Sequence, residues 1–477
     1  MKARSVENAR PGRYVILTAI MLGGIMGPID ASIVNVTLPT IAQYFGTGLS
    51  AAQWVPTIYL LIISSMLLFY GRLGDLFGYK KIYLTGLVGF TIASALCGLT
   101  YFLPGITWLV GFRAIQGLTA GMMMAVPFAM ITAVFPQNER GKALGINAIG
   151  ISAGLAIGPS LGGFINSALG WPFVFVINIP IGIACFFWAR PILPDFKGQA
   201  GKIDFAGAGL SFIGLASFLL FVNNAQHSGL RPGNAMALFV AATAAYAFIR
   251  IEKKADPPML DLKIFSNRNF SFANLSALLN FMSQYVMVFL TPFFLQRILH
   301  YSPRQLGLTM TAFPLAVMAV APFSGSLSDR IGTRTLACLG TSVAAVGLFL
   351  MSQLPQAASN ADVVWRLALF GLGTGIFQSP NNSRAMGSAP KSQLGIASGI
   401  LAATRNVGMA FGIATAGAVL YSLVSPATLR AATLIGEDAA QFFFGLRRAY
   451  LVGACLAALA AVTSFVGGRK RQSETEN

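Results

Sequence analysis

The chain has 477 residues, of which 55% are hydrophobic and only 10% charged, and its mean hydropathy is +0.68. Soluble domains carry about 25% charged residues, so this composition excludes a soluble globular protein and indicates a polytopic membrane protein. The net charge of +18 does not indicate nucleic-acid binding, because the basic residues are scattered between apolar segments and form no single patch.

The basic start, residues 1–13, leads into a long apolar segment without a small-residue cleavage site, so we expect an uncleaved first span. A membrane-spanning helix needs about 20 predominantly apolar residues. The segments that meet this requirement predict an all-α protein with fourteen spans, at residues 14–38, 53–70, 82–102, 106–134, 143–166, 171–189, 204–222, 234–250, 269–295, 305–327, 335–353, 362–383, 394–422 and 447–467.

The distribution of Lys and Arg predicts the orientation. With fourteen spans, 24 basic residues lie on the side of the amino terminus and six on the other side. Three more, Arg113, Arg366 and Arg405, lie within spans. Because basic loops stay in the cytoplasm, we expect both termini to be cytoplasmic and the chain to lie in the cell's inner membrane.

Asp30 lies well inside the first span, where inserting a carboxylate costs about 2.5–3.5 kcal/mol. Its neighbours one helical turn away, Gly23, Gly27, Val34 and Thr37, are small or partly polar, so this face should contact other helices or a cavity. Asp30 is therefore either a proton- or cation-binding site or a structural residue paired to a neighbouring helix.

An internal repeat indicates two related halves. Residues 71–80, GRLGDLFGYK, recur as GSLSDRIGTR at 325–334, an offset of 254. Arg113 and Pro127 match Arg366 and Pro380 at an offset of 253. Glycines 145, 154 and 158 match glycines 399, 408 and 412, again at 254.

The repeat unit is six helices, so we expect an amino-terminal half at 1–190, a linker with two extra spans at 191–268 and a carboxy-terminal half at 269–477. Parallel six-helix repeats place a substrate site at their interface near the bilayer midplane. At an offset of 254, Asp30 maps onto the uncharged Gln284, so the ionisable machinery is predicted to lie in the first half.

Four stretches resemble motifs of the major facilitator superfamily: the loop at 71–81, Arg113-Ala-Ile-Gln-Gly117, the glycine-rich segment 150–163 and the first-helix segment 30–39. The last is similar to the first-helix motif of fourteen-helix drug:proton antiporters of the EmrB/QacA type. The second half departs from the antiporter pattern, because Ile413 and not proline follows Gly412.

The resemblance implies roles for many of these residues. Asp30 and Arg113 would couple transport to protons, although Arg113 could instead be a structural arginine satisfied by carbonyls. The glycine-rich helix would make a tight contact across the interface of the halves, unless it serves plain helix packing; its residues are Gly150, Gly154, Gly158, Pro159, Gly162 and Gly163. The conformational latches at the cytoplasmic face would use Gly71, Arg72, Asp75, Gly78, Lys80, Asp329 and Arg330.

Polar and aromatic side chains at membrane depth are candidates for lining the substrate cavity. The aromatic members could bind a cationic or aromatic substrate, although such side chains more often face lipid or bridge helices. The candidates are Asn35, Tyr59, Phe281, Gln284, Tyr285, Phe377, Gln378, Asn381 and Arg405.

Several other functions are excluded. The chain has no phosphate-binding GxxxxGK[ST] motif, and His227 and His300 have no nucleophile or metal partner, so we expect no enzyme, catalytic residue, metal site or bound cofactor. The four cysteines show no metal-like spacing.

We therefore expect a secondary antiporter, driven by the proton gradient, that exports amphipathic drugs and confers antibiotic resistance. The alternatives are a proton-coupled exporter of one metabolite (a siderophore, sugar, fatty acid or amino acid) and an uncoupled facilitator. Expected partners are the bilayer, protons and a small-molecule substrate, with a periplasmic adaptor and an outer-membrane channel as further candidates, and no nucleic acid.

Overall fold

The computed structural model describes residues 12–467 except 48, 197, 199–202, 229–231, 256–257, 259, 426–427 and 429–435. The described part is helical throughout, as the apolar segments predict. In chain order its helices are α1 (Arg13–Tyr44), α2 (Leu49–Ala52), α3 (Trp54–Phe77), α4 (Tyr79–Leu99), η1 (Thr100–Phe102), α5 (Ile106–Ala125), α6 (Pro127–Val134), α7 (Gln137–Ala168), α8 (Phe173–Val176), α9 (Asn178–Ile192), α10 (Phe205–Ser228), α11 (Pro232–Glu252), η2 (Leu262–Ser266), α12 (Arg268–Phe293), η3 (Phe294–Ile298), α13 (Pro303–Met310), α14 (Ala312–Ile331), α15 (Thr333–Ser352), α16 (Asn360–Ser388), η4 (Lys391–Gln393), α17 (Leu394–Leu423) and α19 (Glu437–Val466).

Twelve helical segments of the described chain are long and apolar enough to cross a membrane, two fewer than the fourteen expected. The difference falls on residues 143–166 and 362–383, which lie on α7 and α16. Both helices are long, with 32 and 29 residues, but neither is among the twelve candidate spans. The two inserted segments of the expected linker are among them, as Phe205–Val222 and Gly233–Glu252.

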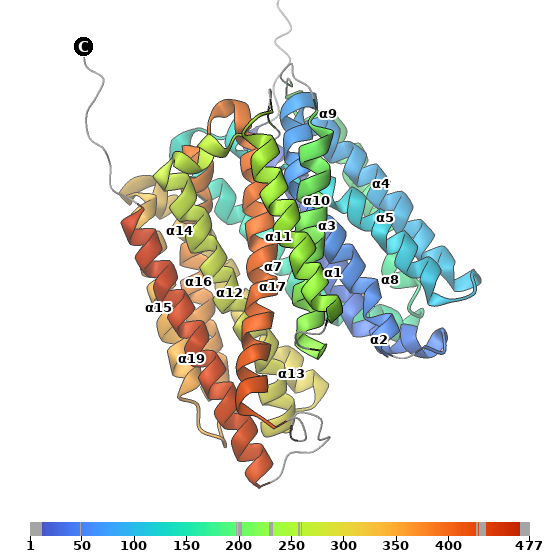
Figure 1. The fold of residues 1–477 in the computed structure, drawn as a ribbon, viewed down its shortest axis with the longest axis vertical. Coiled ribbons are helices and arrows are strands. Elements are labelled where there is room, and N and C mark those ends of the chain that lie inside the picture. The colour runs from blue at the N-terminus through green and yellow to red at the C-terminus, as the bar shows by residue number, and fades with distance from the viewer. Residues whose placement is uncertain are drawn as a thin grey trace, which may run out of the picture.

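The helices form two groups that converge at one end of the bundle. We call this the near end; it contains the start of α1 together with Asp75 and Asp329. The opposite end, which contains Trp171 and Phe442, is the far end. In Figure 1 the blue helices of the first half lie to one side of α10 and α11, and the yellow to red helices lie to the other.

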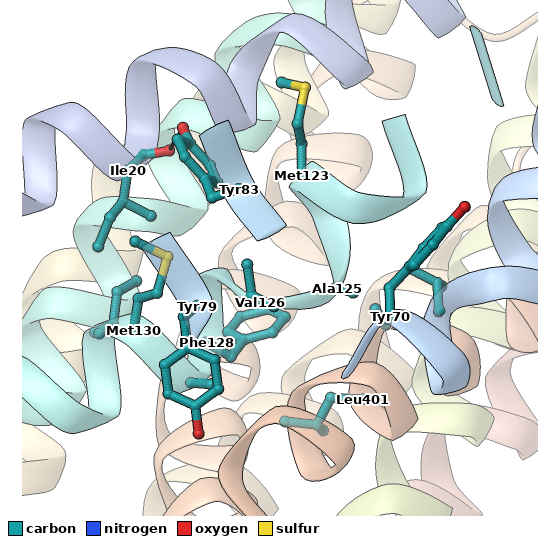
Figure 2. Packing of buried hydrophobic residues seen from close by; sticks show 14 of the residues in the cluster. Ile20, Tyr70, Tyr79, Tyr83, Met123, Ala125, Val126, Phe128, Met130 and Leu401 are labelled. Atoms are coloured by element: carbon teal, nitrogen blue, oxygen red, sulfur yellow. Dashed lines mark hydrogen bonds between the residues drawn. The ribbon is translucent and has the colours of Figure 1, made fainter. Parts of the chain in front are cut away.

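The hydrophobic core shows the same convergence. One cluster of buried residues at the near end joins both halves. It includes Tyr70 and Met130 of the first half and Leu401 of α17, in the second half. Figure 2 shows Tyr70, Val126 and Leu401 in this shared cluster. At the far end the buried residues form two separate clusters, one around Trp171 and one around Phe442. The halves are thus packed together at the near end and have separate cores at the far end.

The inserted pair lies against one seam between the halves. The helix α10 packs on both α3 and α17, which belong to different halves, and the rings of Phe218 and Phe411 lie 4.9 Å apart. The helix α11 packs on α10. On the other side, α7 and α14 pack against each other across the interface.

Close helix contacts confirm the internal repeat in three dimensions. A Cβ added at Gly117 would meet Tyr59, and one at Gly371 would meet Phe313; both pairs are related by 254 positions. The same contacts correct the alignment of the two halves at Asp30 and at Arg113. On α7, Gly154 meets Pro28, whereas on α17, Gly408 meets Phe281, so the first helices of the two halves are related by 253.

The counterpart of Asp30 is therefore Ser283 and not Gln284. The offset of 254 at Gly117 likewise makes Leu367, not Arg366, the counterpart of Arg113. This correction has a physical consequence, because Leu367 is fully buried while Arg366 pairs with Asp362 one turn away. The second half therefore has neither an acid nor a base at the two positions where the first half carries its buried pair.

Candidate functional site

Asp30 is fully buried, although it is a carboxylate near the middle of α1. Small residues on the same helix allow α1 to approach its neighbours: Gly23 lies against Tyr83 of α4, and Gly27 lies against Met124 of α5. The side chain of Asp30 points into the first half and lies against α5 and α9. The face that the sequence predicted to be non-lipid is thus a helix-packing face.

Arg113 of α5 provides the main partner of Asp30. Its Nη1 donates to Oδ2 of Asp30 at 2.5 Å, and both side chains are 0% exposed. Removing one member of a buried ion pair leaves an uncompensated charge, which typically costs about 3–5 kcal/mol. The prediction that these two residues act together is consistent with this contact, which the sequence alone could not establish.

Two amides complete the donors around the carboxylate. Gln116, one turn after Arg113 on α5, donates from Nε2 to Oδ1 of Asp30 at 3.1 Å, and Asn178 at the start of α9 donates to the same oxygen at 3.1 Å. Gln116 also donates to Ser94 of α4 at 2.8 Å. Both amides are almost completely buried, so we call Asp30, Arg113, Gln116 and Asn178 the carboxylate cage.

Sequence reasoning missed the role of both amides. Gln116 stood inside a recognised motif, and its i, i+3 spacing from Arg113 was an available signal. Asn178 had no such signal, because it lies 148 residues from Asp30 and in no motif.

Arg113 has other partners besides Asp30. Its Nε donates to the carbonyl of Val55 at 3.2 Å, and its Nη1 also donates to Oε1 of Gln116 at 2.6 Å. The guanidinium carbon lies 4.0 Å from the ring centre of Tyr59 and 5.6 Å from that of Phe175, distances that allow cation–π attraction. Arg113 would therefore keep several favourable contacts if Asp30 became neutral.

At the near end, two aspartates bridge the halves by accepting hydrogen bonds from helix N-termini. Asp75 of α3 accepts from the backbone N–H groups of Gly395 and Ile396 at 2.6 and 2.9 Å, at the start of α17. Asp329 of α14 accepts from those of Gly141 and Lys142 at 3.0 and 3.1 Å, the fifth and sixth residues of α7. A helix N-terminus attracts an anion through its free N–H groups and its dipole.

Glycines make these contacts possible. A Cβ at Gly71 would overlap the carbonyl of Gly395, and one at Gly325 would overlap that of Gly141. Gly78 and Gly332 turn the chain between helices with φ of 92° and 95°, values that favour glycine. Of the other predicted latch residues, Lys80 pairs with Asp195 at 2.9 Å, the Nε of Arg72 is buried without a hydrogen-bond partner in the described chain, and Arg330 is exposed.

The glycine-rich segment of α7 does not make the contact that the resemblance implies. Gly154, Gly158 and Gly162 pack on α1 of the same half, and a Cβ added at Gly150 would lie 3.2 Å from the side chain of Met21, also of α1. The close contact across the halves is made earlier in α7, where Gly141 and Gly145 meet α14. A Cβ at Gly163 would meet nothing within 4 Å, and the side chain of Pro159 lies outside the described part.

The cavity candidates fall into three groups. Tyr59 and Phe377 are each 1% exposed, so in this conformation they line no accessible space. Asn381 is buried and donates to the carbonyl of Ala273 at 3.0 Å. Gln284 is buried as well, and the remaining candidates keep some exposed surface: Asn35, Phe281, Tyr285, Gln378 and Arg405.

A cavity of about 360 Å³ lies at the near end, between the start of α7 and the end of α14. Its lining includes Lys142, Asp329 and Arg330, so it adjoins the second aspartate bridge and is separate from the carboxylate cage.

Comparison with known proteins agrees with this architecture. The sequence profile of the Major Facilitator Superfamily matches residues 20–413 and again residues 273–477. The chain is 34% identical to the riboflavin transporter RibZ of Clostridioides difficile (strain 630) over 84% of this chain and 87% of that protein. It is 33% identical to the multidrug resistance protein Stp of Mycobacterium tuberculosis (strain ATCC 25618 / H37Rv), over 87% of this chain and 77% of Stp.

Among solved structures, the proton:xylose symporter XylE bound to 6-bromo-6-deoxy-D-glucose superposes with a TM-score of 0.62. That match covers 94% of each chain at 15% identity, so it supports the fold alone. The two matches of the family profile and the relatives above 30% identity agree on one assignment. The chain is a multi-pass membrane transporter, not an enzyme, and belongs to the major facilitator superfamily.

Proposed function

We propose that this transporter is a proton-coupled antiporter that exports amphipathic organic compounds by alternating access. The observation that carries the proposal is the carboxylate cage: a buried acid, one buried arginine and two amide donors within a membrane-embedded half. An intramembrane acid is costly and is usually part of a proton or ion pathway. The relatives named as multidrug transporters support a broad range of amphipathic substrates.

The contacts of Arg113 suggest how a proton could leave and return. While Asp30 is ionised, three donors hold it. When it is protonated, Arg113 can stay bound to Val55 and Gln116 and over the ring of Tyr59. The arginine therefore does not have to move into lipid when its partner is neutralised. Exchange of this proton for substrate would couple export to the proton gradient.

We also propose the fourteen-helix arrangement, in which α7 and α16 cross the membrane together with the twelve candidate spans. With 32 and 29 residues, they extend roughly 48 and 44 Å at 1.5 Å per residue, enough to span a bilayer. Along its length α7 contacts two candidate spans, meeting α14 at Gly145 and α1 at Gly162. The inserted pair α10 and α11 would then give the EmrB/QacA type.

The charge distribution supports a cytoplasmic near end in an inner membrane, with both termini on that side. In that orientation both aspartate bridges close the cytoplasmic face, and the structure is an outward-facing state. Reporter fusions test this orientation. A fusion at Asn223 should report the outer side and one at Lys254 the cytoplasm. The same signal at both positions would mean that α10 and α11 do not cross the membrane as a pair.

The central test is transport by reconstituted protein under an imposed pH gradient. The wild-type protein should move an amphipathic dye or riboflavin only when the gradient is present. Asp30→Asn should insert and bind substrate normally but show no gradient-driven transport, because the amide keeps the shape of the carboxyl and cannot titrate. Wild-type rates in Asp30→Asn would make Asp30 structural and the coupling proposal wrong.

A second candidate function is export of one metabolite by the same mechanism, favoured by the similarity to a riboflavin transporter over most of both chains. Competition decides between the two, because a metabolite exporter should move riboflavin or one other metabolite and ignore unrelated dyes. An uncoupled facilitator would equilibrate substrate equally well without a gradient. Transport by the purified protein alone would also show that neither an adaptor nor an outer-membrane channel is required for the membrane step.

A further inference from the structure

Arg405 is the one charged residue in the interior of α17, and the carboxylate cage does not involve it. It lies eleven residues after the start of the helix at Leu394, roughly 16 Å from the near end of a helix of about 45 Å. An arginine at this depth is expensive and needs a partner or a water-filled space. Within the described chain, however, Arg405 forms no ion pair, and its Nε is buried without a hydrogen-bond partner.

The contacts of α17 show where Arg405 points. Thr404 bonds to Asn274 of α12, and Asn406 donates to Ser64 of α3 at 2.9 Å, across the interface of the halves. Successive residues of a helix are turned by about 100°, so Arg405 lies between these two sides. Phe411, which meets α10, is turned about 120° away from Arg405 on the helix. Arg405 therefore faces the space between the halves, and it is only half-buried.

Polar groups without partners lie on the neighbouring helix α12. Tyr285 packs against Gly412 of α17 and lies near Arg405. One residue earlier on α12, Gln284 has a buried Oε1 without a hydrogen-bond partner, and one turn before it, both polar atoms of the fully buried Asn280 have none within the described chain. Buried polar groups are normally hydrogen-bonded, so such a set indicates a missing ligand or water.

The balance of charge determines which ligand fits. Away from their ends, the helices α1, α3, α5, α12 and α17 carry three charged side chains: Asp30, Arg113 and Arg405. Asp30 and Arg113 neutralise each other. The remaining charge is the single positive charge of Arg405, and no acid on these helices is placed to receive a cation.

We propose that Arg405 is the recognition site for an acidic group of the substrate, so that the preferred substrates are monovalent amphipathic organic anions whose carboxylate pairs with this guanidinium. This inference rests on the proposed transport function and names its substrate class. A guanidinium presents a planar set of donors that matches a carboxylate. Phe281 and Tyr285, on the face of α12 next to Arg405, offer apolar surface for the rest of the substrate.

The test uses three fluorescent probes with the same dansyl group and six-carbon chain, ending in a carboxylate, a primary amide or a trimethylammonium group. Binding to purified protein in detergent is measured without any pH gradient. The wild-type protein should bind the carboxylate at least tenfold more tightly than the amide, and the trimethylammonium probe most weakly. Arg405→Gln should bring the carboxylate and the amide within twofold of each other, and Arg405→Lys should restore part of the preference.

Elution as a monodisperse species and an unchanged melting temperature serve as controls for folding, and Arg366→Gln, at the far end of α16, is the matched control for loss of an arginine. The proposal is overturned if Arg405→Gln keeps the tenfold preference, if Arg405→Lys loses it as completely as Arg405→Gln does, or if the wild-type protein binds the trimethylammonium probe most tightly. Because the measurement needs no gradient, its result is independent of coupling. Carboxylate preference without gradient-driven transport would overturn the proposed function and leave this inference standing.

Discussion

Asp75 and Asp329 lie 254 positions apart and make the same contact with opposite halves of the protein. Each accepts two backbone N–H groups at the start of a helix, Asp75 from α17 and Asp329 from α7. The two bridges differ in environment. Asp75 is 3% exposed and also accepts a hydrogen bond from Tyr79 at 2.7 Å, whereas Asp329 is only half-buried. The residue that corresponds to Tyr79 in the second half is Thr333.

We expect Asp75→Asn to loosen the near end more than Asp329→Asn does. Hydrogen bonds to a charged acceptor contribute about 1.5–3 kcal/mol, and a neutral amide keeps only part of this. Hydrogen exchange measures the effect directly, because the donors are backbone amides. Exchange at Gly395 and Ile396 should rise about tenfold or more in Asp75→Asn and stay unchanged in Asp329→Asn.

The reverse pattern is expected at Gly141 and Lys142, so each variant is the control for the other. Unchanged exchange at both helix starts in both variants would mean that the carboxylates do not hold the halves together.

The second prediction concerns Asn178, which no sequence motif singles out. Asn178→Ala removes one of the three residues that donate to Asp30. We expect a loss of about 1.5–3 kcal/mol in stability and a fall of about tenfold in gradient-driven transport, because the buried acid is left with fewer donors. Asn166→Ala is the matched control, since Asn166 donates to Thr40 at 2.9 Å and is remote from the cage. Equal effects of the two substitutions on transport would show that the cage needs no donor from α9.

The glycines of α7 and α17 give a third prediction, which differs from what the antiporter motif implies. The motif places the essential glycines in the first half, so the same change in the second half should be tolerated better. The packing predicts equal damage. A Cβ at Gly154 would lie 3.0 Å from the side chain of Pro28, and one at Gly408 would lie 2.8 Å from that of Phe281.

Leucine at Gly154, Gly158 or Gly408 should therefore inactivate transport while the protein still reaches the membrane. Gly163→Leu is the control within the same motif, because no atom lies near a Cβ there. Loss of activity in Gly163→Leu comparable to that in Gly154→Leu would make the close helix contacts irrelevant.

The helices and the repeat could be anticipated from the sequence, because each depends on local composition or on short motifs. A joint role of Asp30 and Arg113 was implied only by the resemblance of their motifs, and their contact could not be read from the sequence. The register between the halves could not. A shift of one residue turns a helix position by about 100°, so offsets of 253 and 254 place different side chains at the site. This is why the sequence repeat makes Gln284 the counterpart of Asp30, whereas the helix contacts make Ser283 its counterpart. The contact of Asn178 with Asp30, and the lack of an ion-pair partner for Arg405 among the described residues, depend on long-range packing that no periodicity records.

The last prediction concerns the charge of exported compounds. Asp30 is the one carboxylate deep in a predicted span, so the simplest cycle exchanges one proton for one substrate molecule. Moving one elementary charge against a membrane potential costs about 2.3 kcal/mol per 100 mV. A dication exported against one entering proton carries a net positive charge outward, which the inside-negative potential opposes. A monovalent cation moves no net charge, and neutral or anionic compounds gain help from the potential.

The proposed placement of Arg405 adds a second penalty for dications, because its guanidinium would put a positive charge between the halves. We therefore expect reconstituted protein to export mono-quaternary ammonium compounds faster than bis-quaternary compounds of similar hydrophobicity. The ratio of the mono-quaternary to the bis-quaternary export rate should rise by about 50-fold for each 100 mV of inside-negative potential, because 2.3 kcal/mol corresponds to that factor. The potential is set with potassium and valinomycin. Neutral analogues of the same compounds serve as the control for the effect of hydrophobicity on the export rate. Export of the bis-cation at an equal or higher rate, with Asp30 still the sole essential acid, would contradict the one-proton cycle, because one entering proton cannot balance two exported charges.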